Sequence, residues 1–83
     1  MTSPDDIRAN ARKILYLLTA VQHLRSGEGI APDALQRDLD SHQMPAQDQQ
    51  LALEYAREQG WIQGGPNGEV QLTDQGFVLN FGQ

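Results

Sequence analysis

The hydrophobic pattern of this chain changes its period at Gly60. Before this residue, apolar side chains recur at the spacing of one helix face, whereas residues 69–72 alternate apolar and polar as a half-buried strand does. Turn-forming residues at 64–68 separate that segment from a short apolar strand at 61–63. The sequence therefore predicts a mainly α structure with one small β-hairpin, an α+β arrangement of three helices, a hairpin and a short C-terminal helical segment.

Proline and glycine residues mark where the helices should begin and end. Helices are predicted over residues 4–25, 32–42 and 45–59. Ser3 is placed to cap the first helix, and Gly27 and Gly60 are placed to end the first and third in the left-handed region. Thr73 is placed to cap the C-terminal helical segment, after strands near 61–63 and 69–72.

The chain has 83 residues, which is enough for one domain, 1–83, with one small core. Because Trp61 directly follows the predicted helix stop, we expect its side chain to be buried. We expect Gly76 to allow two backbone segments to pack closely.

The first predicted helix has an unusually wide apolar face, about 180° by the helical wheel, where a helix on one core needs roughly 100°. It is therefore either central or shared with a second subunit. If the helix is central, this face packs under the C-terminal segment 77–81. If the face is shared with a second subunit, the candidate dimer seam is Leu17, Val21 and Leu24. The opposite face is predicted to carry Arg8, Arg12, Thr19 and His23.

Two segments, Leu53 to Ile62 and Val70 to Phe77, together form one pattern. A helix ends in Gly-aromatic-Ile, a hairpin follows, and the sequence Leu-Thr-acid-x-Gly comes after it. This order resembles small winged helix-turn-helix regulators of bacteria and archaea, including MarR-like and PadR-like proteins. The resemblance covers residues 31–79. It implies a winged-helix fold with the helix-turn-helix at about 31–60 and the wing at about 61–73.

The resemblance also implies that the helix at 45–59 is the recognition helix. Its outward arc should carry five polar residues, Gln47, Gln50, Glu54, Arg57 and Glu58. Glutamine and arginine can pair with adenine and guanine, so this face could read DNA. The two glutamates favour instead a protein-binding or simply solvated face. The tip of the wing, 64–69, has no lysine or arginine, where DNA-binding wings usually carry at least one.

The net charge of −5 is concentrated in the middle of the chain, where residues 27–60 hold seven acidic and two basic residues. Nucleic-acid affinity rests largely on neutralised phosphates, so this balance disfavours autonomous DNA binding. Arg8 and Arg12 on the first helix are the candidate phosphate contacts; the other interpretation is an ordinary exposed helix face.

No enzymatic constellation is identifiable. The chain lacks cysteine, His23 and His42 lack metal-ligand spacing, and no nucleophile, phosphate loop or membrane-length apolar run is present. We therefore expect no metal, cofactor or small-molecule ligand, no membrane, and a cytoplasmic location. The sequence predicts a non-enzymatic binding module acting through protein–protein contacts, as a homodimer or a regulatory adaptor. The alternative is a DNA-binding transcription regulator that reads DNA with residues 45–59.

Overall fold

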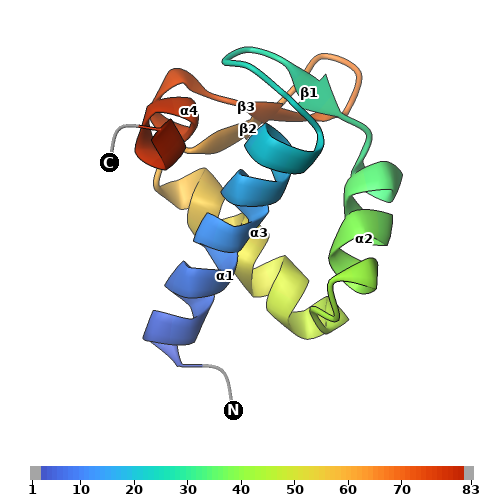
Figure 1. Cartoon of the computed structure of the whole chain (residues 1–83), viewed down its shortest axis with the longest axis vertical. Helices are drawn as coiled ribbons and strands as arrows, with labels where there is room; N and C mark the ends of the chain where they lie inside the picture. The colour runs from blue at the N-terminus through green and yellow to red at the C-terminus, as the bar shows by residue number, and fades with distance from the viewer. Residues whose placement is uncertain (1–2, 82–83) are drawn as a thin grey trace.

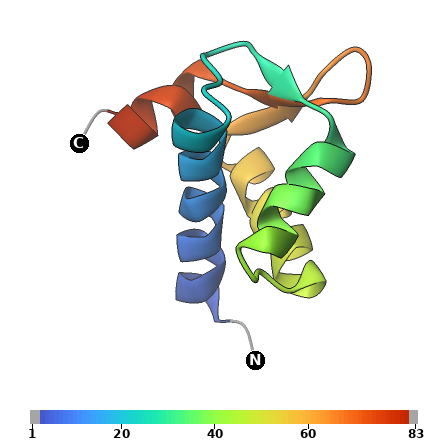
Figure 2. The same cartoon turned by 45° about the vertical axis from the view of Figure 1, so that its right-hand side comes forward.

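Helix α1 stands at the centre of the molecule in the computed structural model, which describes residues 3–81 (Figure 1). The elements follow in the order α1 (Pro4–Tyr16), the π-helical turn η1 (Leu17–Val21), β1 (Gly29–Ile30), α2 (Pro32–Ser41), α3 (Ala46–Glu58), β2 (Ile62–Gly64), β3 (Val70–Leu72) and α4 (Asp74–Phe81). In both views α2 and α4 lie on opposite sides of α1, and the sheet lies across one end of the helices (Figures 1 and 2). Because α1 packs against both α3 and α4, its central position accounts for its wide apolar face.

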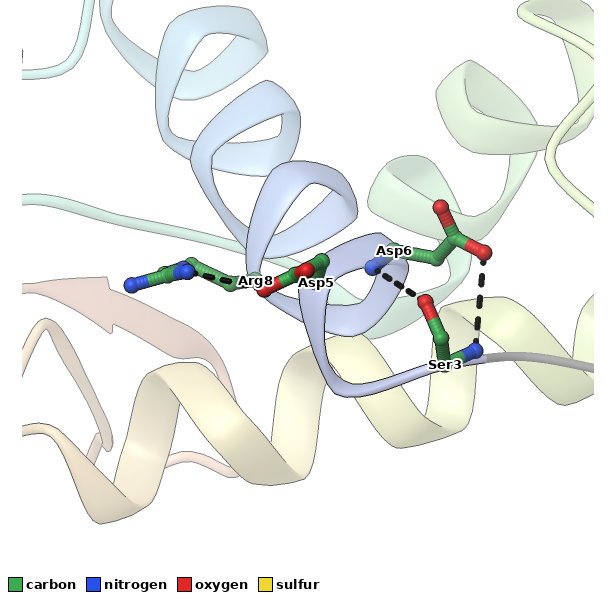
Figure 3. A network of polar contacts seen from close by, with 4 residues as sticks. All are labelled: Ser3, Asp5, Asp6 and Arg8. Atoms are coloured by element: carbon green, nitrogen blue, oxygen red, sulfur yellow. Dashed lines mark hydrogen bonds and ion pairs between the residues drawn. The ribbon is translucent and has the colours of Figure 1, made fainter.

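The start of α1 is fixed by a reciprocal cap, in which Ser3 is the N-cap predicted from the sequence. The backbone N–H of Asp6 donates to the Ser3 hydroxyl at 3.2 Å, and the Ser3 N–H donates to the Asp6 carboxylate at 3.4 Å (Figure 3). These two bonds satisfy backbone donors that have no partner within the helix. Pro4 follows at the first helical position, where its missing N–H costs nothing.

The end of the first helix differs from the prediction, which extended the helix to residue 25. After Tyr16 the helix widens into a π-turn, in which the N–H of Gln22 donates to the carbonyl of Leu17 at 2.9 Å. His23 then adopts φ 58° directly after the helix end. Gly27 is left-handed as predicted, with φ 87°, but it lies in the loop that follows and does not end the helix. The extra residue in the turn changes the direction of the side chains around it, and Thr19, predicted on the exposed face, is buried and donates to the carbonyl of Leu15 at 2.9 Å.

The sheet has three antiparallel strands in the order β1-β3-β2. The predicted hairpin is confirmed, with each strand within one residue of its expected position and Gln63 paired with Gln71. Strand β1 was not predicted; its two residues pair Gly29 with Gln71 and Ile30 with Val70. The sheet thereby ties the segment before α2 to the hairpin that follows α3.

The junction after α3 agrees with the sequence prediction except at Trp61. Gly60 ends the helix with φ 79°, as expected. The Thr73 hydroxyl accepts the N–H of Gly76 at 3.1 Å and caps α4. A Cβ on Gly76 would lie 2.2 Å from the carbonyl oxygen of Trp61, which confirms the close backbone approach. Trp61 itself is only half-buried: it packs against the outside of the core cluster, with its ring edge-on to Tyr55 at a centroid distance of 5.6 Å.

The core lies where α1, α2, α3 and the sheet meet. Its largest fully buried side chains come from α1, η1, α2 and the sheet: Ile14, Leu15, Leu17, Leu18, Leu35, Leu39, Ile62 and Leu72. Helix α3 contributes the small side chains of Ala52 and Ala56. Between residues 3 and 81, none of the helices combines the length and apolar character needed to cross a bilayer.

Candidate functional site

The outward face predicted for residues 45–59 is exposed on α3. All five of its side chains, Gln47, Gln50, Glu54, Arg57 and Glu58, are accessible to solvent. None of these side chains makes a hydrogen bond or an ion pair with another described residue. The structure therefore brings together five polar groups that are available to a ligand or to water.

A groove of about 510 Å³ runs beside this face, between α2, α3 and β3. Gln50, Glu54 and Arg57 line it from α3, while Gln47 and Glu58 do not. The other lining residues are Pro32, Leu35, Gln36, Leu39, Ala46, Gln49, Leu53 and Val70. The groove thus has an apolar floor and a rim of amides and charged groups, a combination typical of binding sites. We call it the α2–α3 groove.

The turn between α2 and α3 is locked by the buried side chain of Gln49. Its Nε2 donates to Asp40 Oδ1 at 2.6 Å and to the carbonyl of Met44 at 2.7 Å. These bonds tie the end of α2 to the first turns of α3 and so set the width of the α2–α3 groove. Sequence analysis missed Gln49, although the signal was present: Gln49, Ala52 and Ala56 share one helical stripe.

The loop joining β2 to β3 lies at the end of the molecule where α2 begins (Figures 1 and 2). Its residues, 65–69, include no lysine or arginine. The carboxylate of Glu69 accepts the N–H of Asn67 at 3.2 Å, so a negative charge is held inside the turn. The loop therefore offers no group that would neutralise a phosphate.

The predicted phosphate contacts on α1 differ in their surroundings. Arg8 pairs with Asp5, the Nη2–Oδ1 distance being 3.0 Å (Figure 3). Arg12 is exposed, and its side chain has no partner among residues 3–81. Both lie on α1, which starts at the end of the molecule remote from the sheet (Figures 1 and 2). Arg8 lies in the first half of α1, and Arg12 lies in its second half, nearer the sheet.

Only part of the candidate dimer seam is accessible to a second subunit. Leu17 is 1 % exposed and belongs to the core of the single chain, so it is not available to a second subunit. Leu24 is half-buried against the same core, and Val21 is exposed. Tyr16, the residue that precedes the π-turn, is also exposed. Helix α4 contacts α1, and Phe77 packs against the core cluster to which Leu17 belongs. Tyr16 is not covered in this way, and the side chain of residue 81 is outside the described residues.

Residues 3–81 contain no group of three His, Asp or Glu side chains placed to hold a metal ion. No family model, curated protein or solved structure matches the chain. The features of the chain that bear on its function are therefore the α2–α3 groove and the charges around it.

Proposed function

We propose that this protein is a non-enzymatic, cytoplasmic winged-helix module that binds a partner protein through the α2–α3 groove. The observation that carries the proposal is an open, apolar-floored groove lined by unpaired polar side chains of α3, with no base in the adjacent loop. A groove of this kind can bury an apolar side chain of a partner and pair with its backbone. The same surroundings repel a phosphate backbone.

The winged-helix part of the proposal is supported by the order of the elements. One helix precedes a short strand, two helices follow it, and a hairpin completes the sheet with β3 in the middle. In this order β1 is the unpredicted strand that closes the sheet on the side opposite β2. Gly60 and Thr73, on which the resemblance rests, end α3 and cap α4. These are structural roles, so they do not identify the ligand.

Site-specific photo-crosslinking tests the proposal. A photoreactive residue at Gln50, on the rim of the groove, should give an adduct in source cells that protease removes and nuclease does not. The matched control is Gln75, also exposed but on α4, on the far side of α1 from α2 (Figure 2). An adduct removed by nuclease, or equal adducts from both positions, would contradict a protein-binding groove.

A second function, DNA reading by α3, is favoured by Gln47, Gln50 and Arg57, which are exposed, unpaired and carried on one helix. We expect no measurable binding to random duplex DNA at ~150 mM salt, where non-specific binders reach roughly 10⁻⁴–10⁻⁶ M. Fluorescence anisotropy measures this directly. Tight binding that Gln50→Ala and Arg57→Ala both weaken would place the chain among DNA-binding regulators instead.

Self-association is the other form of protein contact in the proposal. The exposed residues Tyr16 and Val21 support it, at 56 % and 44 % relative exposure. Light scattering at ~100 µM should give about twice the monomer mass, because small domains gain stability by association. Val21→Glu should restore the monomer without unfolding it, since the side chain already faces solvent. If the wild type is a monomer at that concentration, the homodimer is excluded.

A further inference from the structure

The floor of the α2–α3 groove is apolar and only partly covered by the chain itself. Leu53 and Val70 are half-buried there, and Pro32 and Ala46 are exposed at its margins. At about 510 Å³ the groove falls within the range of sites that bind small ligands or single side chains. An occupant must therefore bring an apolar group of modest size.

The side chains on the rim of the groove can both donate and accept hydrogen bonds. Gln36 on α2 and Gln50 on α3 are exposed on the two walls, and neither side chain makes a hydrogen bond within the described residues. A carboxamide both donates and accepts, as a peptide group does. The two walls are thus suited to an occupant with a free polypeptide backbone.

The elements that form the groove carry a net negative charge, while the groove lining itself holds one carboxylate, Glu54, and one base, Arg57. The elements that form it, α2, α3 and the loop before β3, carry Asp33, Asp38, Asp40, Asp48, Glu54, Glu58 and Glu69 against Arg37 and Arg57. Two of these carboxylates accept hydrogen bonds from neutral side chains: Asp38 from the Gln22 amide, and Asp40 from the Gln49 amide. Neutral amides leave the negative charge in place, and neither arginine forms an ion pair among residues 3–81.

We infer that the α2–α3 groove binds a basic segment of a partner protein, with an apolar side chain on Leu53 and Val70 and a lysine or arginine beside Glu54. This rests on the proposed function and specifies the chemistry of the partner. The charge around the groove selects a cationic occupant and rejects phosphates and acidic peptides. A second copy of this chain fits less well, because it also carries a net charge of −5 and would be repelled by the acidic elements around the groove.

Selection from a random library of twelve-residue peptides on the immobilised full chain tests this inference. The wild type should enrich peptides in which lysine or arginine neighbours an apolar residue. Glu54→Lys should lose these peptides or enrich acidic ones, because it places like charges together. Glu28→Lys is the control: it makes the same charge change at an exposed loop position outside the groove, and should behave as wild type.

One enriched peptide, labelled and titrated by anisotropy, gives the magnitude. We expect Glu54→Lys to weaken its binding by roughly tenfold or more, which corresponds to about 1.4 kcal/mol, and Glu28→Lys to leave it within twofold. Enriched peptides without basic residues, or equal affinity for wild type and Glu54→Lys, would overturn the inference while leaving a protein-binding groove intact. Peptide affinity that falls as the protein is concentrated would assign the groove to a second copy and overturn it too. If no peptide is enriched, the inference fails, and crosslinking at Gln50 still decides the proposed function separately.

Discussion

Replacing Gly76 by alanine should destabilise the fold, although alanine is the better helix former. Gly76 lies in α4 and is buried, and a Cβ there would be 2.2 Å from the carbonyl oxygen of Trp61 and 3.1 Å from a methyl group of Leu72. The carbonyl belongs to the backbone and accepts the N–H of Thr73 at 3.1 Å, so it cannot rotate away as a side chain would. Helix α4 must shift instead.

The magnitude is set by two opposing effects. Overpacking of a closely packed site costs ~1–3 kcal/mol, and a backbone contact belongs at the upper end of this range. Alanine regains ~1 kcal/mol of helix propensity relative to glycine. The expected net loss is therefore about 2 kcal/mol, or roughly 8–16 °C in Tm for a domain of this size.

Urea and thermal unfolding followed by the fluorescence of the single tryptophan, Trp61, measure this loss. Gly64→Ala is the matched control, because a Cβ there meets no atom within 4 Å and the backbone is not left-handed. Its stability should stay within about 0.5 kcal/mol of wild type. If Gly76→Ala were as stable as the control, α4 would not be held against Trp61 as described.

Three further substitutions test the local features of the fold. Gly60→Ala should cost ~1–2 kcal/mol in urea unfolding, because an L-residue is strained at φ 79°; an unchanged midpoint would show that the helix end relaxes without cost. Gln49→Leu should lower stability by ~1–3 kcal/mol, because it leaves the buried carbonyl of Met44 without its partner; Gln50→Leu, at the exposed neighbour, should change stability by less than about 0.5 kcal/mol, and equal effects would show that Gln49 does not lock the turn. Ser3→Ala should cost ~1 kcal/mol and Ser3→Asp should not, as judged by Tm; equal losses would mean that the cap does not stabilise α1.

The features predicted well from sequence are those whose cause is local. The Ser3 cap, the Gly60 stop and the hairpin each depend on a few consecutive residues with distinctive chemistry. The exposure of the α3 face followed from helical periodicity alone, since the positions of Gln50, Glu54 and Arg57 on a regular helix are fixed by their spacing.

The features missed depend on contacts between distant segments. Strand β1 consists of two residues, and only the pairing of Gly29 and Ile30 with β3 makes them a strand. The groove joins Pro32, Leu53 and Val70 from three elements, so no single stretch of sequence contains it. Trp61 was predicted in the core from its position after Gly60, but its large ring is accommodated beside Tyr55, a neighbour that α3 provides.

The π-turn at Leu17–Val21 should allow the first helix to lose one residue without a change in the direction of the chain after it, which a regular helix cannot do. Removing one residue from an α-helix turns everything after it by about 100°, which would here carry Gly29 away from Gln71. A π-turn already holds one residue more than an α-turn, so deleting Ala20 would let the helix become regular while Gln22 keeps its direction. Thr19 would then turn toward solvent, where the regular wheel places it. Single-residue deletions should therefore be accepted at this turn and rejected earlier in α1, which makes η1 the point at which the distance between the helix and the sheet can change in evolution.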